Sequence, residues 1–136
     1  MVKITVDNKS FGNGYAIARD PVFGSAEMES LGTDYQADGY TTRSQADEIG
    51  QDLALGPGGL LLDVGAGCGF PGLYLAKRHG CAVISLDPVA EGGQVARQRA
   101  ISDGLSERSW AIQADAESIP LPSRSVDAVV QADVLC

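Results

Sequence analysis

The sequence predicts an α/β fold in which a mostly parallel sheet is covered by helices on both faces. Two observations lead to this prediction. From Leu60 onward, short apolar runs alternate with stretches of helical periodicity, as expected for repeated strand-helix-strand units. In addition, a glycine-rich stretch follows the first apolar run, which is typical of a tight turn between a strand and a helix. The four predicted strands are Leu60 to Val64, Ala82 to Leu86, Trp110 to Ala114 and Asp127 to Gln131.

Three helices are predicted at Gln45 to Leu55, Phe70 to His79 and Val89 to Asp103. The first follows Ser44, whose hydroxyl would cap it, with the Asp47 carboxylate in the first turn as in a capping box. Gly80 and Gly104 directly follow the second and third helices, and glycine is common just past a helix end. The second and third helices therefore connect successive parallel strands.

Residues 1–43 do not follow this pattern. Val2, Ile4 and Val6 alternate as in a strand, but glycines and prolines interrupt the sequence after them. We therefore expect a loosely structured N-terminal arm over residues 1–43 and one folded domain over residues 44–136.

Composition excludes several classes of protein. The chain has 136 residues and a formal net charge of −8, whereas nucleic-acid binding depends on clustered Lys and Arg. No apolar run is as long as a membrane span and no signal-peptide pattern is present, so we expect a cytoplasmic protein without membrane contact. The three cysteines have neither a disulfide nor a zinc-ligand pattern, so no metal site is predicted.

The glycine-rich stretch has two interpretations as a cofactor site. In the first, Asp63 precedes the alternating glycines Gly65, Gly67 and Gly69, an arrangement found in S-adenosylmethionine sites. In the second, Gly67-x-Gly69-x-x-Gly72 matches the dinucleotide fingerprint. Both place bare backbone at a sharp bend, where a ligand can approach closely. The glycines alone do not decide between them.

Three aspartates bear on this choice. Asp87 ends the second predicted strand about 20 residues after Gly67, and its carboxylate suits the ribose hydroxyls of either cofactor. Asp63 would repel a nearby pyrophosphate but suits a cationic sulfonium with an α-amino group. Asp115 ends the third predicted strand at the same sheet edge, where a carboxylate can accept a hydrogen bond from an adenine amine. The aspartates therefore favour S-adenosylmethionine.

Three segments together resemble the class I S-adenosylmethionine-dependent methyltransferases, in the small-molecule branch that includes the quinone-biosynthesis enzymes. The resemblance covers residues from about Tyr40 to Cys136. It rests on Leu61-Leu62-Asp63-Val64-Gly65-Ala66-Gly67-Cys68-Gly69, on Ile84-Ser85-Leu86-Asp87, and on residues 114–122 leading into Ser125-Val126-Asp127-Ala128-Val129-Val130. It implies a Rossmann-like methyltransferase fold.

The resemblance also implies a role for each segment. The glycine-rich loop would lie along the methionine and ribose portions of the cofactor, with contacts from Asp63, Gly65, Ala66, Gly67 and Gly69. Asp87 would bind the ribose hydroxyls and Asp115 the adenine amine, with Pro88 and Ala116 beside them adding contacts. Gln131, at the end of the fourth strand, would face the methionine end and the reaction cleft.

The family's sheet has seven strands in the order 3-2-1-4-5-7-6, whereas this sequence ends just after the fourth. We therefore expect only the N-terminal half of the sheet, in the order 3-2-1-4. Its fourth strand would have an unpaired outer edge, and such edges favour pairing with another strand. We expect either a fragment or a homo-oligomer formed through this edge.

The resemblance implies transfer of a methyl group to a small-molecule acceptor. Because the cofactor carries the activated methyl group, the protein mainly binds and orients, and no catalytic side chain is identified. Two alternatives stay open at this point. One is a catalytically silent S-adenosylmethionine-binding module, and the other is a fragment of an NAD(P)-dependent oxidoreductase.

Overall fold

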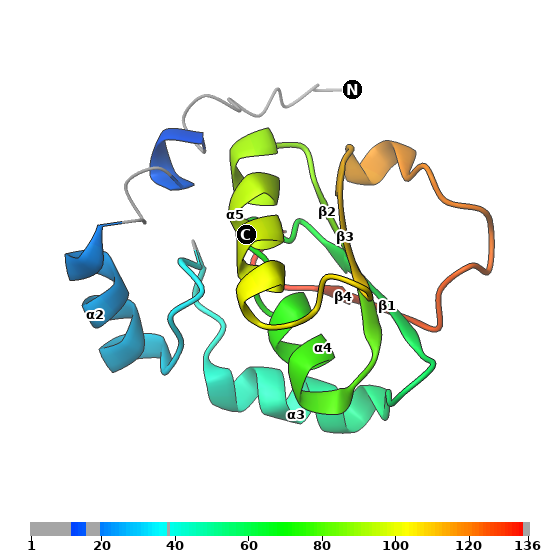
Figure 1. The fold of residues 1–136 in the computed structure, drawn as a ribbon, viewed down its shortest axis with the longest axis horizontal. Coiled ribbons are helices and arrows are strands. Elements are labelled where there is room, and N and C mark those ends of the chain that lie inside the picture. The colour runs from blue at the N-terminus through cyan, green and yellow to red at the C-terminus, as the bar shows by residue number, and fades with distance from the viewer. Residues whose placement is uncertain (1–11, 16–19, 38, 135–136) are drawn as a thin grey trace.

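The computed structural model describes residues 12–15, 20–37 and 39–134. At its centre lies a parallel sheet of four strands in the order β3-β2-β1-β4 (Figure 1). The strands are β1 (Leu60–Val64), β2 (Ala82–Asp87), β3 (Ser109–Gln113) and β4 (Ala128–Gln131). The predicted order is confirmed, and each predicted strand boundary lies within one residue of the observed one.

The central strand β1 sets the register of the sheet. Asp63 is paired with Ser85 of β2 on one side and with Val130 of β4 on the other. Because side chains alternate along a strand, Leu61 and Asp63 face one side of the sheet, and Leu62 and Val64 face the other. Because β1 and β2 are parallel, their carboxyl ends meet at the same edge, where the glycine-rich loop begins.

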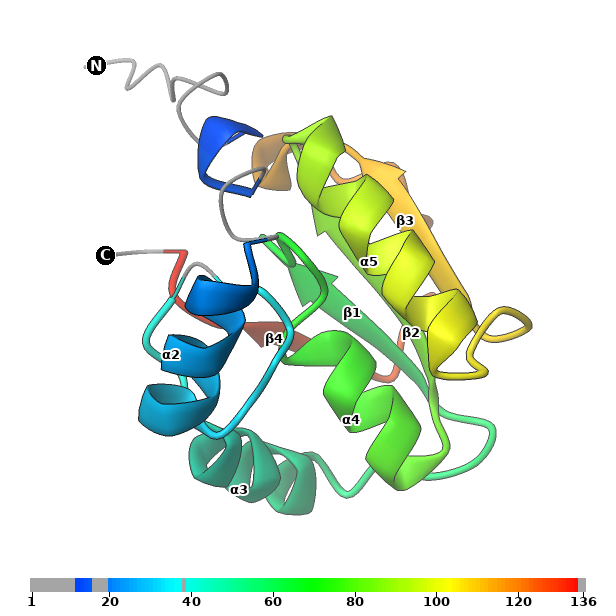
Figure 2. The same ribbon diagram turned by 60° about the vertical axis from the view of Figure 1, so that its left-hand side comes forward.

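One face of the sheet is covered by helices. They are α3 (Arg43–Leu53), α4 (Gly72–His79) and α5 (Ala90–Ser102). Figure 2 shows α4 and α5 side by side against the strands, with α3 beside α4. Apolar side chains from these helices and from the sheet form the largest core cluster, which includes Leu61, Leu73, Leu75, Ala76, Val83, Ala96, Ala100 and Leu105. Burial of this cluster supplies the main driving force for folding of the domain.

The opposite face has a different cover. Leu62, Val64, Ile84 and Leu86 form a second cluster, which packs against Leu121, Val126 and other apolar residues. Leu121 and Val126 lie on the connection between β3 and β4, whose only helical turn is η1 (Ala116–Ser118). The sequence predicted helices on both faces. In the described residues the three long helices of the domain share one face, because this connection is an irregular loop.

The first helix of the domain begins two residues earlier than predicted, at Arg43 and not at Gln45. Thr42, not Ser44, is the N-cap: its hydroxyl accepts a hydrogen bond from the Gln45 N–H at 3.2 Å. The Gln45 side chain accepts one from the Thr42 N–H at 2.8 Å, which completes the capping box. Asp47 instead forms an ion pair with Arg78 at 2.9 Å and so joins α3 to α4.

The N-terminal region is more ordered than its composition suggested. Residues Pro21–Leu31 form α2, although no regular structure was expected within the arm at 1–43. The Asp20 carboxylate caps its start by accepting from the Val22 N–H at 2.9 Å, and Gly32 ends it with a φ of 73°. The strand-like alternation of Val2, Ile4 and Val6 lies outside the described residues.

A buried carboxylate ties α2 to the segment that follows it. Glu27 accepts hydrogen bonds from the Thr33 hydroxyl at 2.6 Å, the Tyr35 N–H at 2.9 Å and the Gln36 N–H at 2.8 Å. A further N–H, from Ala37, lies at 3.3 Å. Hydrogen bonds to a charged acceptor are stronger than neutral ones, so Glu27 holds residues 33–37 in one conformation.

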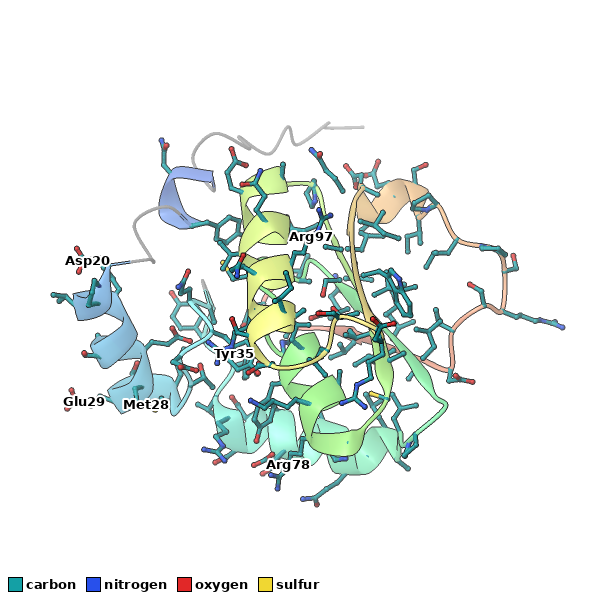
Figure 3. The ribbon with its side chains drawn as sticks, in the orientation of Figure 1. Asp20, Met28, Glu29, Tyr35, Arg78 and Arg97 are labelled. Atoms are coloured by element: carbon teal, nitrogen blue, oxygen red, sulfur yellow. The ribbon has the colours of Figure 1, made fainter. Side chains whose placement is uncertain are left out.

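Tyr35 attaches this segment to the domain (Figure 3). Its ring lies in the main core with its centroid 5.5 Å from that of Phe70, and the Arg99 guanidinium lies 4.1 Å from the Tyr35 ring centroid. The Tyr35 hydroxyl donates to Asp103 at 3.2 Å. Residues 33–37 are therefore part of the folded unit.

The described residues contain neither a membrane-spanning helix nor a cluster of metal ligands. None of the helices there has the length and hydropathy that crossing a membrane requires. No group of three or more His, Cys, Asp or Glu side chains in the same part of the chain is arranged to hold a metal ion.

The substitution Glu27→Gln should lower the free energy of unfolding by about 2–3 kcal/mol, because an amide group replaces a charged acceptor among several donors. Glu29→Gln is the matched control, since Glu29 lies in the same helix and is exposed (Figure 3). Urea unfolding of both variants and the wild type measures the difference. Equal midpoints for the two variants would contradict this role of Glu27.

Candidate functional site

A cleft of about 210 Å³ lies at the carboxyl ends of the central strands. Five of the predicted site residues line it, and they come from the glycine-rich loop and from the end of β2. These are Gly65, Ala66, Gly67, Asp87 and Pro88. The edge formed by the carboxyl ends of parallel strands is the usual ligand site in open α/β sheets.

The glycine-rich loop presents backbone to this cleft. Gly65 and Gly67 have φ angles of 71° and 50°, a region that favours glycine. The N–H groups of Gly65 and Ala66 both donate to the Leu86 carbonyl, at 2.8 and 3.1 Å, so the loop is held against the end of β2. A side chain at Gly65 would collide with Val134, and one at Gly67 would contact the Tyr15 hydroxyl. The bare backbone therefore leaves room for the segments that surround the cleft.

Asp87 connects the two loops that form the wall of the cleft. One of its carboxylate oxygens accepts from the Gly67 N–H and the other from the Val89 N–H, both at 2.8 Å. Its side chain is 8% exposed, and burial raises its pKa, while the two backbone N–H groups act in the opposite direction. Each oxygen has a second lone pair, so the carboxylate can still accept a hydrogen bond from a ligand.

Asp63 lies beneath the loop and does not line the cleft. It is buried, and one of its oxygens accepts from the Gly72 N–H at 2.8 Å, at the first residue of α4. A side chain at Gly72 would overlap the Asp63 carboxylate. Burial raises the pKa of Asp63 to about 7, the Gly72 N–H opposes this shift, and the nearby charge of Asp87 adds to it. Asp63 therefore fixes the start of α4 relative to β1.

Four other predicted residues lie around the cleft without lining it. Asp115 is exposed and caps η1 by accepting from the Glu117 N–H at 3.0 Å, and Ala116 follows it on the surface. Gln131 is exposed at the end of β4. Gly69 is buried, and its N–H donates to the Ala66 carbonyl at 2.7 Å within the loop. The structure thus brings the loop and Asp87 together and leaves Asp115 and Gln131 outside their cleft.

Other residues of the cleft were not among the predicted site residues. Cys68, Phe70 and Val89 adjoin the predicted loop and Asp87, whereas the rest come from distant parts of the chain: Tyr15, Ala37, Gly39, Ala132, Asp133 and Val134. Tyr15 is buried and packs with Cys68 and Val89. A single aromatic residue within a glycine-rich arm has no local signal that would place it over a loop far along the chain.

A second cavity of about 220 Å³ adjoins the first. The two share Gly67, Asp87 and Val89, and the second continues between α5 and β3 past Arg97 (Figure 3) and Gln113. Asp87 therefore lies where the two hollows meet.

The raised pKa of Asp63 predicts a pH dependence of stability. Its ordinary pKa of 3.8 rises to about 7 in the folded chain. At a pH between these two values, Asp63 is protonated in the folded state and ionised in the unfolded state. The contribution of Asp63 to stability is thus largest at acidic pH and decreases as the pH rises toward 8, by an amount on the order of 2–4 kcal/mol. Asp63→Asn, which does not titrate, should show a smaller decrease. Urea unfolding at pH 5 and pH 8 measures both slopes, and identical slopes would contradict the assignment.

Comparison with known sequences identifies relatives of this chain. The family model described as "Methyltransferase domain" matches residues 62–136. Methyltransferase GfsG of Streptomyces halstedii is 32% identical over 83 residues, which cover 61% of this chain and 30% of that protein.

Solved structures show the same fold. A methyltransferase from Thiobacillus denitrificans, in complex with S-adenosyl-L-homocysteine, is 26% identical with a TM-score of 0.59 over 66% of this chain and 36% of that one. A protein from Methanococcus maripaludis, described as a putative S-adenosylmethionine-dependent methyltransferase, covers 96% of this chain and 52% of its own, with 20% identity and a TM-score of 0.64. This chain thus spans about a third to a half of the length of these relatives. It belongs to the methyltransferase domain family, within the class I S-adenosylmethionine-dependent methyltransferases.

Proposed function

We propose that this chain binds S-adenosylmethionine and serves as the cofactor-binding part of a methyltransferase that acts on a small-molecule acceptor. The observation that carries the proposal is the position of Asp87. Its carboxylate lies at the junction of two adjoining hollows, next to the bare backbone of Gly67. The ribose is the middle part of S-adenosylmethionine, so a ribose at Asp87 would have one hollow for each end of the cofactor.

The charges around the cleft support a cationic cofactor. Its described lining contains the carboxylates of Asp87 and Asp133 and no Lys, Arg or His. Asp63 adds a further acidic group beneath the loop. Such surroundings attract a sulfonium and an α-amino group and repel the pyrophosphate of a dinucleotide. The acidic lining of this cleft therefore fits the sulfonium and α-amino groups of S-adenosylmethionine, while Arg97 lines the adjoining hollow, which would take the adenine end.

The residues of the chain would bind and orient the cofactor. When bound, S-adenosylmethionine supplies a methyl group already activated by the sulfonium. Asp87 would accept from the ribose hydroxyls, while its bonds to Gly67 and Val89 keep both loops in place. Phe70 and Val89 contribute apolar surface to the cleft, which excludes water. The rate of methyl transfer then depends mainly on how precisely donor and acceptor are aligned.

We assign the adenine to the side of Asp115. Asp115 and Ala116 begin η1 after β3, and the exposed Asp115 carboxylate has one described hydrogen bond, from the Glu117 N–H. Its second oxygen is therefore available to the adenine amine. Gln131, at the end of β4, would face the methionine end.

The outer edge of β4 is our proposed contact between two copies of the chain. In the described residues β4 pairs with β1 alone, so its other edge has unpaired backbone groups. Val129 is 54% exposed on this strand, on the same face as Leu62. Pairing with a second β4 would satisfy the backbone groups and cover Val129.

Sedimentation velocity tests this contact. We expect the wild type to form a dimer at tens of micromolar, and Val129→Lys to be monomeric because it places charges on the shared surface. Ile101→Lys is the matched control, because Ile101 is equally exposed at 54% but lies on α5. A monomeric wild type at these concentrations would contradict the proposal.

Calorimetric titration with S-adenosylhomocysteine and with NAD tests the cofactor. We expect the wild type to bind the former and not the latter, and Asp87→Asn and Asp115→Asn each to weaken binding by about 10-fold or more, because each replaces a charged acceptor with a neutral amide. Asp52→Asn is the control, since Asp52 is exposed on α3 and lines neither hollow. Tighter binding of NAD would overturn the proposal, and unchanged affinity in Asp115→Asn would remove Asp115 from the site.

A further inference from the structure

Two segments far apart in the sequence meet at the cleft. Gly39 comes from the stretch before α3, and Ala132, Asp133 and Val134 directly follow β4. Val134 lies against Gly65, where an added side chain would collide with it. The segment after β4 therefore lies directly on the glycine-rich loop.

One carboxylate joins the two segments. A single oxygen of Asp133 accepts from the Tyr40 N–H at 3.1 Å, the Thr41 N–H at 3.0 Å and the Thr41 hydroxyl at 2.7 Å. A side chain at Gly39 would overlap this carboxylate, so glycine is the residue that fits there. These contacts connect positions more than 90 residues apart in the sequence.

A second aspartate flanks the same strand at its other end. The Asp127 carboxylate accepts from the Leu60 N–H at 2.8 Å, at the start of β1. Both aspartates are exposed, and both bind backbone N–H groups of a segment from earlier in the chain. Only Asp133 lines the cleft, so Asp127 provides the comparison in which the same kind of bond lies away from the site.

We propose that Asp133 is a positioning residue of the cofactor site. Its hydrogen bonds to residues 40 and 41 hold the segment before α3 against the segment after β4. The wall of the cleft is then complete when S-adenosylmethionine binds. The inference rests on the proposed function, because it assigns the cleft to that cofactor. Because these hydrogen bonds order the two segments before the cofactor binds, less free energy is lost in ordering them on binding, and the affinity is higher.

The test is a calorimetric titration of S-adenosylhomocysteine into the wild type, Asp133→Ala, Asp133→Asn and Asp127→Ala. We expect Asp133→Ala to raise the Kd at least 10-fold and Asp133→Asn to fall between it and the wild type, since an amide oxygen still accepts. Asp127→Ala should keep the wild-type Kd within 2-fold even where its Tm falls. Hydrogen exchange gives a second readout, in which ligand should slow exchange of the Tyr40 and Thr41 amides in the wild type but not in Asp133→Ala.

Thr41→Val and Thr41→Ser test the same bond from its other side if Asp133→Ala does not fold. The valine removes the hydroxyl and should raise the Kd, while the serine keeps it and should not. Equal Kd values for the Asp133 and Asp127 variants, or for the two Thr41 variants, would overturn the inference while leaving the proposed function standing. A wild type that does not bind S-adenosylhomocysteine would instead overturn the proposed function, and this inference with it.

Discussion

The Asp87 carboxylate accepts hydrogen bonds from the backbone N–H groups of Gly67 and Val89, and the shape of the site depends on this pair of bonds. Gly67 belongs to the loop after β1, and Val89 precedes α5, so a single side chain at the end of β2 fixes the loops on both sides of it. The Leu86 carbonyl adds to this by accepting from Gly65 and Ala66. The part of the wall next to Asp87 is therefore formed by backbone that this carboxylate and the Leu86 carbonyl hold in place.

The acidic groups at this edge have separate physical roles. Asp63 is buried and holds the start of α4 through Gly72, with its pKa raised to about 7 mainly by burial. Asp87 lines the cleft, and Asp133 joins two segments over it. Burying carboxylates close together without a cation costs folding free energy. A bound cation at this edge would lower that cost, which gives the chain a physical reason to bind a sulfonium more tightly when these groups are ionised.

Much of the fold followed from local pattern. The strand positions and the loop at Gly65 to Gly69 were predicted because apolar runs and glycines are local signals, whereas the strand order was predicted from the resemblance to the methyltransferases. Three features depended on contacts that local pattern does not contain. Glu27 orders residues 33–37 through hydrogen bonds, and nothing in the sequence around Glu27 distinguishes it from an exposed helical glutamate. Tyr15 contacts the glycine loop from far away in the sequence, and the irregular connection after β3 packs on the sheet face for which the fold class predicted helices. The structure brings Gly65, Ala66, Gly67 and Asp87 together because they lie in one loop and at the neighbouring strand end, and it leaves Asp115 and Gln131 outside the lining of their cleft.

The central claim is that one ligand spans the junction at Asp87, in contact with the loops that this carboxylate joins. Nuclear magnetic resonance of the ¹⁵N-labelled chain during addition of S-adenosylhomocysteine tests it most directly. The account predicts that the amide signals of Gly65, Gly67 and Val89 shift together, with a single saturation curve. Saturable shifts confined to other parts of the chain, with these three amides unchanged, would contradict it.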